Sequence, residues 1–232
     1  MPKGKLIVID GLDGSGKQTQ TELLYKYLRC NDINCKLIDF PQYESVTGSI
    51  VRQYLRGEIC KNNIDDKDRI RTALLYSYDR MFNMFLRLDE QNKSIMDYYN
   101  EGYCIICDRY TSSNYLYMTH GLLYNEFVDF INELEDIEYN HMGLPKPDLS
   151  IFFELTPEKS LELINKRGLE KDNHETNEIL TKAYESLQRY KQFTKTEESL
   201  NNTVHFINCL NSQNDLYSIE DIFREVRNCL IK

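Results

Sequence analysis

Residues 5–19 read KLIVIDGLDGSGKQT, an apolar run followed by a glycine-rich turn. The run at 5–10 predicts a short strand that is buried on both faces, as strands of parallel sheets are. Residues 11–17 match the pattern G-x-x-x-x-G-K, and Lys17 then opens a helical pattern. In such a turn the glycines let successive N–H groups face one point, and the helix adds its positive end. We therefore expect a loop that binds phosphate groups.

This loop predicts a nucleotide-binding segment with one unusual position. The residues expected to bind the nucleotide are Gly11, Leu12, Asp13, Gly14, Ser15, Gly16, Lys17, Gln18 and Thr19. Gln18 stands where a Ser or Thr hydroxyl normally binds Mg²⁺. Gln18 could bind the ion through its amide oxygen. Alternatively, carboxylates could hold the ion through water, and Asp108 is the candidate among them. The sequence leaves both possibilities open.

The rest of the chain alternates apolar runs with helical patterns. Further strands are expected at residues 35–40, 103–108, 149–155 and 203–207, and helices are expected at 48–55, 66–88, 113–136, 177–198 and 219–231, with another beginning at Thr156-Pro157-Glu158. This alternation predicts an α/β fold in which helices flank a five-stranded parallel sheet. Because low-complexity linkers are absent, we expect residues 1–232 to form one domain. Ligands of such sheets bind at the carboxyl ends of the strands.

Composition excludes several classes of protein. The 37 acidic and 28 basic residues give a formal net charge of −9, which argues against a nucleic-acid partner. An apolar stretch of 18 residues is missing, so no membrane partner is expected. Seven cysteines and no signal-peptide pattern predict a cytoplasmic location. Cys104 and Cys107 have metal-site or redox spacing, but they lie in an apolar run, so buried strand cysteines are the preferred interpretation.

Further motifs identify a family that the sequence resembles. They are residues 11–20, Phe40-Pro41, LLYSYDR at 74–80, Asp108-Arg109-Tyr110 with Ser113, and GLPKPDL at 143–149. Together, and in this order, they resemble thymidylate kinases over nearly the whole chain. The resemblance implies the P-loop NTPase fold of the nucleoside monophosphate kinases, with a lid at about residues 166–177. It also implies transfer of the γ-phosphoryl group of ATP to dTMP, with Mg²⁺.

The resemblance also implies how the acceptor nucleotide is held. Arg109 follows the third strand directly, and its guanidinium can bind the acceptor phosphate with two parallel hydrogen bonds. Arg52 resembles a second phosphate-binding arginine. Tyr76 and Arg80 share one helix face, so the ring can stack on a pyrimidine while Arg80 donates to the base O4. Phe40 resembles the family residue before the proline that follows the second strand.

The segment after Arg109 is expected to close over the base and the deoxyribose through Ser113, Asn114 and Tyr117. Tyr117 would block a ribose 2′-OH, and Asp13 would approach the sugar 3′-OH or the metal. Met118 stands where bacterial relatives often have Gln. Since Met cannot make that amide's hydrogen bonds, either the thymine preference is looser or Asn114 takes over the role.

The catalytic residues expected from the resemblance are Lys17, Asp108, Arg109 and Arg167. Family members place a catalytic arginine either in the phosphate loop or in the lid, and position 14 is Gly. The lid offers Lys166, Arg167 and Lys171, of which Arg167 is our choice. Family members are commonly homodimers through helices beside the nucleobase helix.

Two other functions remain open at this point. One is a different P-loop kinase, which acts on other deoxynucleoside monophosphates or on a nucleoside 5′-hydroxyl. The Met118 position keeps this possibility open. The other is a nucleotide-binding protein without catalytic activity, which the Gln18 position makes conceivable.

Overall fold

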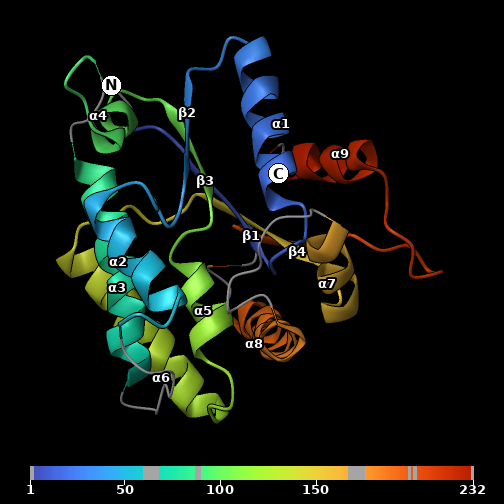
Figure 1. The fold of residues 1–232 in the computed structure, drawn as a ribbon. Helices are drawn as coiled ribbons and strands as arrows, with labels where there is room; N and C mark the ends of the chain where they lie inside the picture. The colour runs from blue at the N-terminus through green and yellow to red at the C-terminus, as the bar shows by residue number, and fades with distance from the viewer. Residues whose placement is uncertain are drawn as a thin grey trace.

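The computed structural model describes residues 3–59, 68–86, 90–166, 176–197, 200 and 203–230. Within these residues, five parallel strands form one sheet in the order β2-β3-β1-β4-β5 (Figure 1). The strands are β1 (Leu6–Gly11), β2 (Cys35–Asp39), β3 (Cys104–Asp108), β4 (Leu149–Glu154) and β5 (Val204–Asn208). This arrangement confirms the expected α/β fold with a five-stranded parallel sheet.

Helices connect the strands and cover the sheet. They are α1 (Lys17–Cys30), α2 (Val46–Leu55), α3 (Asp68–Phe85), α4 (Ile95–Asn100), α5 (Ser112–Met118), α6 (Tyr124–Glu135), the π-helix η1 (Asp136–His141), α7 (Pro157–Lys166), α8 (Asn177–Thr196) and α9 (Ile219–Cys229). Figure 1 shows α1 and α9 on one side of the sheet and α3, α5 and α8 on the other. None of the described helices is long and apolar enough to cross a bilayer.

Burial of the strands follows from these two helical layers. All six residues of β1 are buried, and Ile9 packs with Leu24 of α1 and Ile222 of α9. Phe152 of β4 points the other way and packs with Leu187 of α8. A central parallel strand therefore reads as a continuous apolar run, because both of its faces are covered.

The sheet register brings the ends of two strands together. Ile9 of β1 lies opposite Asp108 of β3, so the turn after β1 and the residues after β3 share one edge of the sheet. The turn after β1 is the phosphate loop, and Arg109 follows β3 directly. The edge predicted to bind ligands is thus built from segments almost 100 residues apart in sequence.

Asp79 of α3 fixes the position of α2. Its buried carboxylate accepts hydrogen bonds from the Gln42 backbone N–H (2.9 Å), from the Thr47 hydroxyl (2.8 Å) and from the Ser45 hydroxyl (3.2 Å). Ser45 also caps α2 by accepting from the Gly48 backbone N–H. The segment after β2 is therefore tied to the nucleobase helix expected from the sequence.

Some element boundaries differ from the sequence predictions. The predicted helical stretch 113–136 is divided into α5 and α6 and continues into η1, and α4 was not predicted. The helix predicted at 66–88 is described as Asp68–Phe85. Most of the lid predicted at 166–177, including Arg167 and Lys171, lies outside the described residues.

Candidate active site

Two neighbouring cavities open at the carboxyl edge of the sheet. The larger one is lined by the phosphate loop and by Asp108. The smaller one is lined by residues of α3 and α5. Asp13, Phe40, Pro41, Tyr43 and Arg109 line both. These shared residues mark the boundary at which a group held in one cavity meets a group held in the other.

The phosphate loop has the left-handed backbone that its glycines permit. Gly14 has φ +77° and Gly16 has φ +84°, conformations that residues with a side chain rarely adopt. The hydroxyl of Ser15 is buried and has no hydrogen-bond partner among the described residues. A buried donor without a partner is costly, so the loop is prepared for an acceptor such as a phosphate oxygen.

Lys17 is buried at the start of α1, and its Nζ donates to the carbonyl oxygen of Leu12 (2.6 Å). Burial and the neighbouring charge of Arg109 lower the pKa of Lys17 to about 8. Gln18 and Thr19, which follow it, are exposed and line the larger cavity. A bound phosphate would raise this pKa again by placing negative charge beside the amine.

The structure also explains why position 14 is glycine. A Cβ at Gly14 would lie 2.6 Å from the backbone oxygen of Ser160 and 2.9 Å from the Ile164 side chain. Both residues belong to α7, which packs directly against the loop. An arginine at position 14 is therefore excluded by the position of α7.

Arg109 lies where the two cavities meet. Its backbone is left-handed (φ +67°), and its backbone N–H donates to the carbonyl oxygen of Ile9 (2.9 Å). The guanidinium forms an ion pair with Asp13 and stacks over the ring of Tyr117, 5.4 Å from its centre. Although burial disfavours the charge, the carboxylates of Asp13 and Asp10 raise the pKa of Arg109 further above its usual value. Arg109 therefore stays charged.

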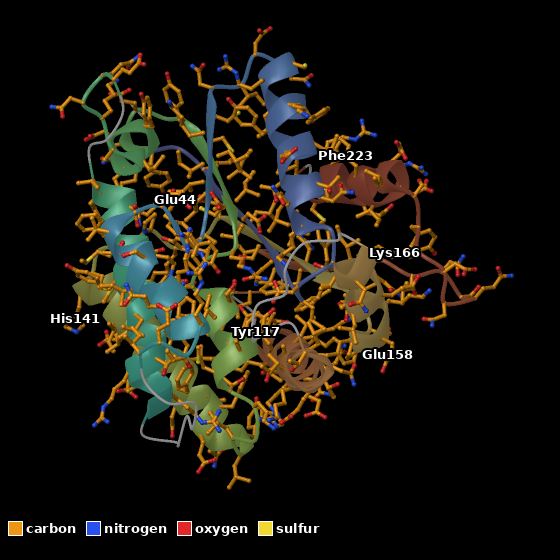
Figure 2. All side chains as sticks on the ribbon, viewed as in Figure 1. Glu44, Tyr117, His141, Glu158, Lys166 and Phe223 are labelled. Carbon is orange, nitrogen blue, oxygen red and sulfur yellow. The ribbon has the colours of Figure 1, made fainter. Side chains whose placement is uncertain are left out.

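A second set of polar contacts holds the segment after Arg109. Asp10 is buried and accepts hydrogen bonds from the hydroxyls of Ser112 (2.7 Å) and Ser113 (2.9 Å). Tyr117, one turn further along α5, donates to Asp13 Oδ2 (2.9 Å) and is labelled in Figure 2. These contacts tie α5 to the end of β1 and to the phosphate loop.

Asp108 offers a carboxylate to the larger cavity. Burial raises the pKa of Asp108, while Lys17 and Arg109 oppose the rise. Carboxylate and amide oxygens suit Mg²⁺, so Asp108 and Gln18, which line the same cavity, have the chemistry of ligands for this ion. The described residues include no group of three or more His, Cys, Asp or Glu side chains placed to hold a metal.

The smaller cavity brings together most of the residues expected to bind the acceptor base. Tyr76 and Arg80 line it from α3, and Ser113, Asn114, Tyr117 and Met118 line it from α5. Tyr76 packs edge-on against Tyr54 of α2, with ring centres 6.4 Å apart. Met118 is buried in this wall. Aromatic, amide and guanidinium groups thus surround one space.

Two residues were not anticipated from the sequence. Glu138 of η1 is fully buried and forms an ion pair with Arg80. A sequence signal existed, because the apolar positions Phe127, Ile131 and Leu134 of α6 continue in helical spacing to position 138. A glutamate at that position is exceptional. Tyr43 lines both cavities, and no motif marks it.

Two predicted residues lie away from the centre of the site. Arg52 is not among the described residues that line the two cavities; its guanidinium pairs with Glu44 and lies 5.4 Å from the ring centre of Tyr43. Lys166 lines the larger cavity from the end of α7, but its exposed side chain donates to Glu162 (2.6 Å; Figure 2).

Comparisons with known proteins point to a single family. The family model described as "Thymidylate kinase" matches residues 9–214. The thymidylate kinase of Plasmodium falciparum (isolate 3D7) is 31% identical over 199 residues, which cover 86% of this chain and 81% of that protein. The thymidylate kinase of Prochlorococcus marinus (strain AS9601) is 33% identical over 160 residues, which cover 68% of this chain and 70% of that protein.

A solved structure of a thymidylate kinase from Candida albicans has the same fold. It matches with a TM-score of 0.67 at 24% identity, over 99% of this chain and 92% of that chain. The match of the family model to nearly nine-tenths of the chain, together with the relatives above, leads to one conclusion: this chain belongs to the thymidylate kinase family.

Proposed function

We propose that the chain transfers the γ-phosphoryl group of ATP to dTMP, giving dTDP and ADP, and that the two cavities hold the two nucleotides. The observation that carries this proposal is the position of Arg109 and Asp13, which line both cavities. ATP would occupy the larger cavity with its phosphates on the loop around Lys17. The phosphate of dTMP would meet the γ-phosphate beside Arg109.

The chemistry asked of the protein is positioning and charge stabilisation. Phosphoryl transfer proceeds in line, and negative charge spreads over the oxygens of the transferred group. Lys17 and Arg109 place two positive charges beside this group, in a region where burial strengthens them. Arg167 would add a third charge from the lid. An oxygen of the dTMP phosphate would attack the γ-phosphorus directly and ADP would leave, so this mechanism has no covalent enzyme intermediate.

Mg²⁺ is the metal we propose for this site, with Asp108 and Gln18 as the residues that would hold it, directly or through water. When bound, the ion would neutralise charge on the β- and γ-phosphates. The support is the hard oxygen chemistry of the two side chains and their place on the wall of the larger cavity.

The acceptor base would lie in the smaller cavity between Tyr76 and α5. Tyr76 would stack on the pyrimidine, and Arg80 would donate to its O4. Tyr117 is held by Asp13 beside Arg109, where its ring would fill the space that a ribose 2′-OH needs. This arrangement favours a deoxyribose. Asp13 would face the sugar, and Arg52 would reach the phosphate only after leaving Glu44.

We also propose a homodimer and a cytoplasmic location. Exposed apolar side chains lie on the neighbouring helices α2 (Val46, Ile50) and α3 (Tyr78, Phe85). A second copy of the chain would cover these side chains. The cytoplasmic location rests on the seven cysteines and on the use of ATP.

The experiment that tests the reaction is an ADP-release assay with ATP and Mg²⁺. dTMP, dUMP, dGMP, dCMP and dAMP are offered separately, each with and without excess EDTA. We expect a strong preference for dTMP and loss of activity in EDTA. Equal turnover of all acceptors would mean that Met118 leaves the base pocket unselective, and ATP binding without turnover would contradict the proposed reaction. Unchanged activity in EDTA would show that the reaction does not need Mg²⁺.

A further inference from the structure

The side chain of Glu138 is buried behind Arg80 and Asn114, two residues that line the smaller cavity. It is 0% exposed, and its partner Arg80 is 2% exposed. One carboxylate oxygen, Oε1, accepts from Arg80 Nη2, from the Ser77 hydroxyl and from Asn114 Nδ2 (3.4 Å). Three donors that come from two helices, α3 and α5, therefore converge on one oxygen.

This convergence decides which way the amide of Asn114 faces. Among the described residues, its hydrogen-bond partners are the Glu138 carboxylate and the Ala73 carbonyl oxygen (3.5 Å), and both are acceptors. Only the amide nitrogen can donate to them, so Nδ2 must face inward. Asn114 also lines the cavity. Its carbonyl oxygen Oδ1 is thus the atom that the side chain offers to a ligand, and it is an acceptor.

Glu138 fixes Arg80 in the same way. Both hydrogen bonds of the guanidinium within the described residues, to Glu138 and to Ser77 (3.3 Å), start from Nη2. The remaining N–H groups are donors only, and Arg80 lines the cavity. The wall behind the base therefore offers one fixed acceptor and one fixed donor.

A pyrimidine with a 4-oxo group and an N3–H complements this pair of groups. Its N3–H can donate to Asn114 Oδ1, and its O4 can accept from Arg80. Cytosine has an unprotonated N3 and a 4-amino group, so it would place acceptor against acceptor and donor against donor. Unpaired buried polar groups give strong discrimination, because each mismatch costs the desolvation of both groups.

We propose that Glu138 is a positioning residue for base selection: it holds Asn114 and Arg80 in the orientation that accepts thymine or uracil and rejects cytosine. This inference rests on the proposed function and names the group that enforces its specificity. A role in stability alone explains the glutamate less well. Buried ion pairs can often be replaced by apolar residues without loss of stability, and the apolar spacing of α6 leads to position 138.

The test compares Glu138→Gln with the wild type by kcat/KM for dTMP, dUMP and dCMP. The glutamine side chain has nearly the same shape, but its amide can turn either an oxygen or a nitrogen toward Asn114. We expect the preference for dTMP over dCMP to fall at least about tenfold. The preference for dTMP over dUMP should stay within about twofold, because these two bases share the same N3 and O4 groups. Glu133→Gln, an exposed change of the same charge on α6, is the matched control and should leave both ratios unchanged.

A fall in kcat/KM by the same factor for all three acceptors would overturn the proposal, because it would mean that Glu138 only supports the fold. Unchanged ratios would overturn it as well. If Glu138→Gln does not fold, the same ratios are measured for Glu138→Asp. The shorter side chain keeps the charge near Arg80 but withdraws from Asn114, so the ratio of dTMP to dCMP should still fall, and an unchanged ratio contradicts the proposal. Absence of dTMP turnover by the wild type would instead contradict the proposed function.

Discussion

The carboxylate of Asp13 binds the guanidinium of Arg109, although the two residues lie 96 positions apart in the sequence. Asp13 belongs to the phosphate loop and Arg109 follows β3, so this ion pair connects the two cavities across the edge of the sheet. The charge of Arg109 is therefore in place before either nucleotide arrives. A site that is arranged in advance needs little reorganisation during the reaction.

Replacement of Arg109 by lysine tests the need for its planar guanidinium. Lysine keeps the positive charge but cannot bind Asp13 and a phosphate with parallel hydrogen bonds. We expect Arg109→Lys to lower kcat/KM for dTMP at least about thirtyfold, roughly 2 kcal/mol. Initial rates at varied dTMP measure this loss. A lysine variant with wild-type kcat/KM would show that charge alone is sufficient.

The contribution of the lid is tested by Arg167→Ala. Since transferred charge must be stabilised and position 14 holds no arginine, we expect kcat to fall at least about tenfold, roughly 1.4 kcal/mol. The KM for dTMP should change little. Lys182→Ala removes a charge that pairs with Glu178 and lines neither of the two cavities, and it serves as the control. Wild-type kcat in Arg167→Ala would remove this residue from the mechanism.

The pH dependence of ATP use follows from Lys17. Its pKa of about 8 means that the free enzyme loses this charge as the pH rises through that value. We expect kcat/KM for ATP to decline above about pH 8, because the phosphates then meet a neutral amine. In kcat the decline should begin at higher pH, since bound phosphates raise the pKa of Lys17.

Lys17→Arg provides the control for this profile. An arginine stays protonated over the whole range, so the weaker remaining activity should lose the alkaline decline. A decline that persists in Lys17→Arg would assign the titration to another group.

Gly14 and Gly16 form a matched pair for testing the contact between the loop and α7. Both have positive φ, so alanine at either position costs about 1 kcal/mol or more of backbone strain. Only at Gly14 does a Cβ also meet α7; at Gly16 a Cβ would have no described residue within 4 Å. Gly14→Ala should therefore lower the free energy of unfolding by more than Gly16→Ala does, as measured by urea denaturation. Equal losses would show that α7 gives way freely.

The proposed homodimer predicts a particle of twice 27.5 kDa in sedimentation experiments. Tyr78→Glu would put a charge on the exposed apolar surface of α2 and α3 and should shift the protein toward the monomer. Tyr217→Glu changes a tyrosine of similar exposure in the segment before α9 and should not. A wild type that sediments as a monomer would contradict the dimer.

Much of the fold could be predicted because the central strands are buried on both faces. The apolar runs at 5–10 and 103–108 correspond to β1 and β3, and the glycine-rich turn identified the phosphate loop between β1 and α1. The same turn, with Arg109, fixed the edge of the sheet where the cavities lie. These predictions depend on local pattern, which the sequence contains directly.

The remaining features depend on packing between distant segments. Helical spacing extends from α6 to position 138, but it does not tell which residue Glu138 of η1 meets; that residue is Arg80, 58 positions away in sequence. The pairing of Arg52 with Glu44, rather than a place on a cavity wall, is a choice between partners that spacing cannot make. Arg167 lies outside the described residues, so its role stays a prediction.

The contact between Gly14 and α7 also limits how this enzyme can change. The nearest obstacle to a side chain at position 14 is the backbone oxygen of Ser160, which no substitution removes. A variant that carries its catalytic arginine in the phosphate loop would therefore have to move the whole of α7. Because α7 ends at Lys166, that movement would also shift the point from which the predicted lid segment starts. In this chain, then, single substitutions cannot replace an arginine of the predicted lid by one in the phosphate loop. In evolution or in engineering, both segments would have to be remodelled together.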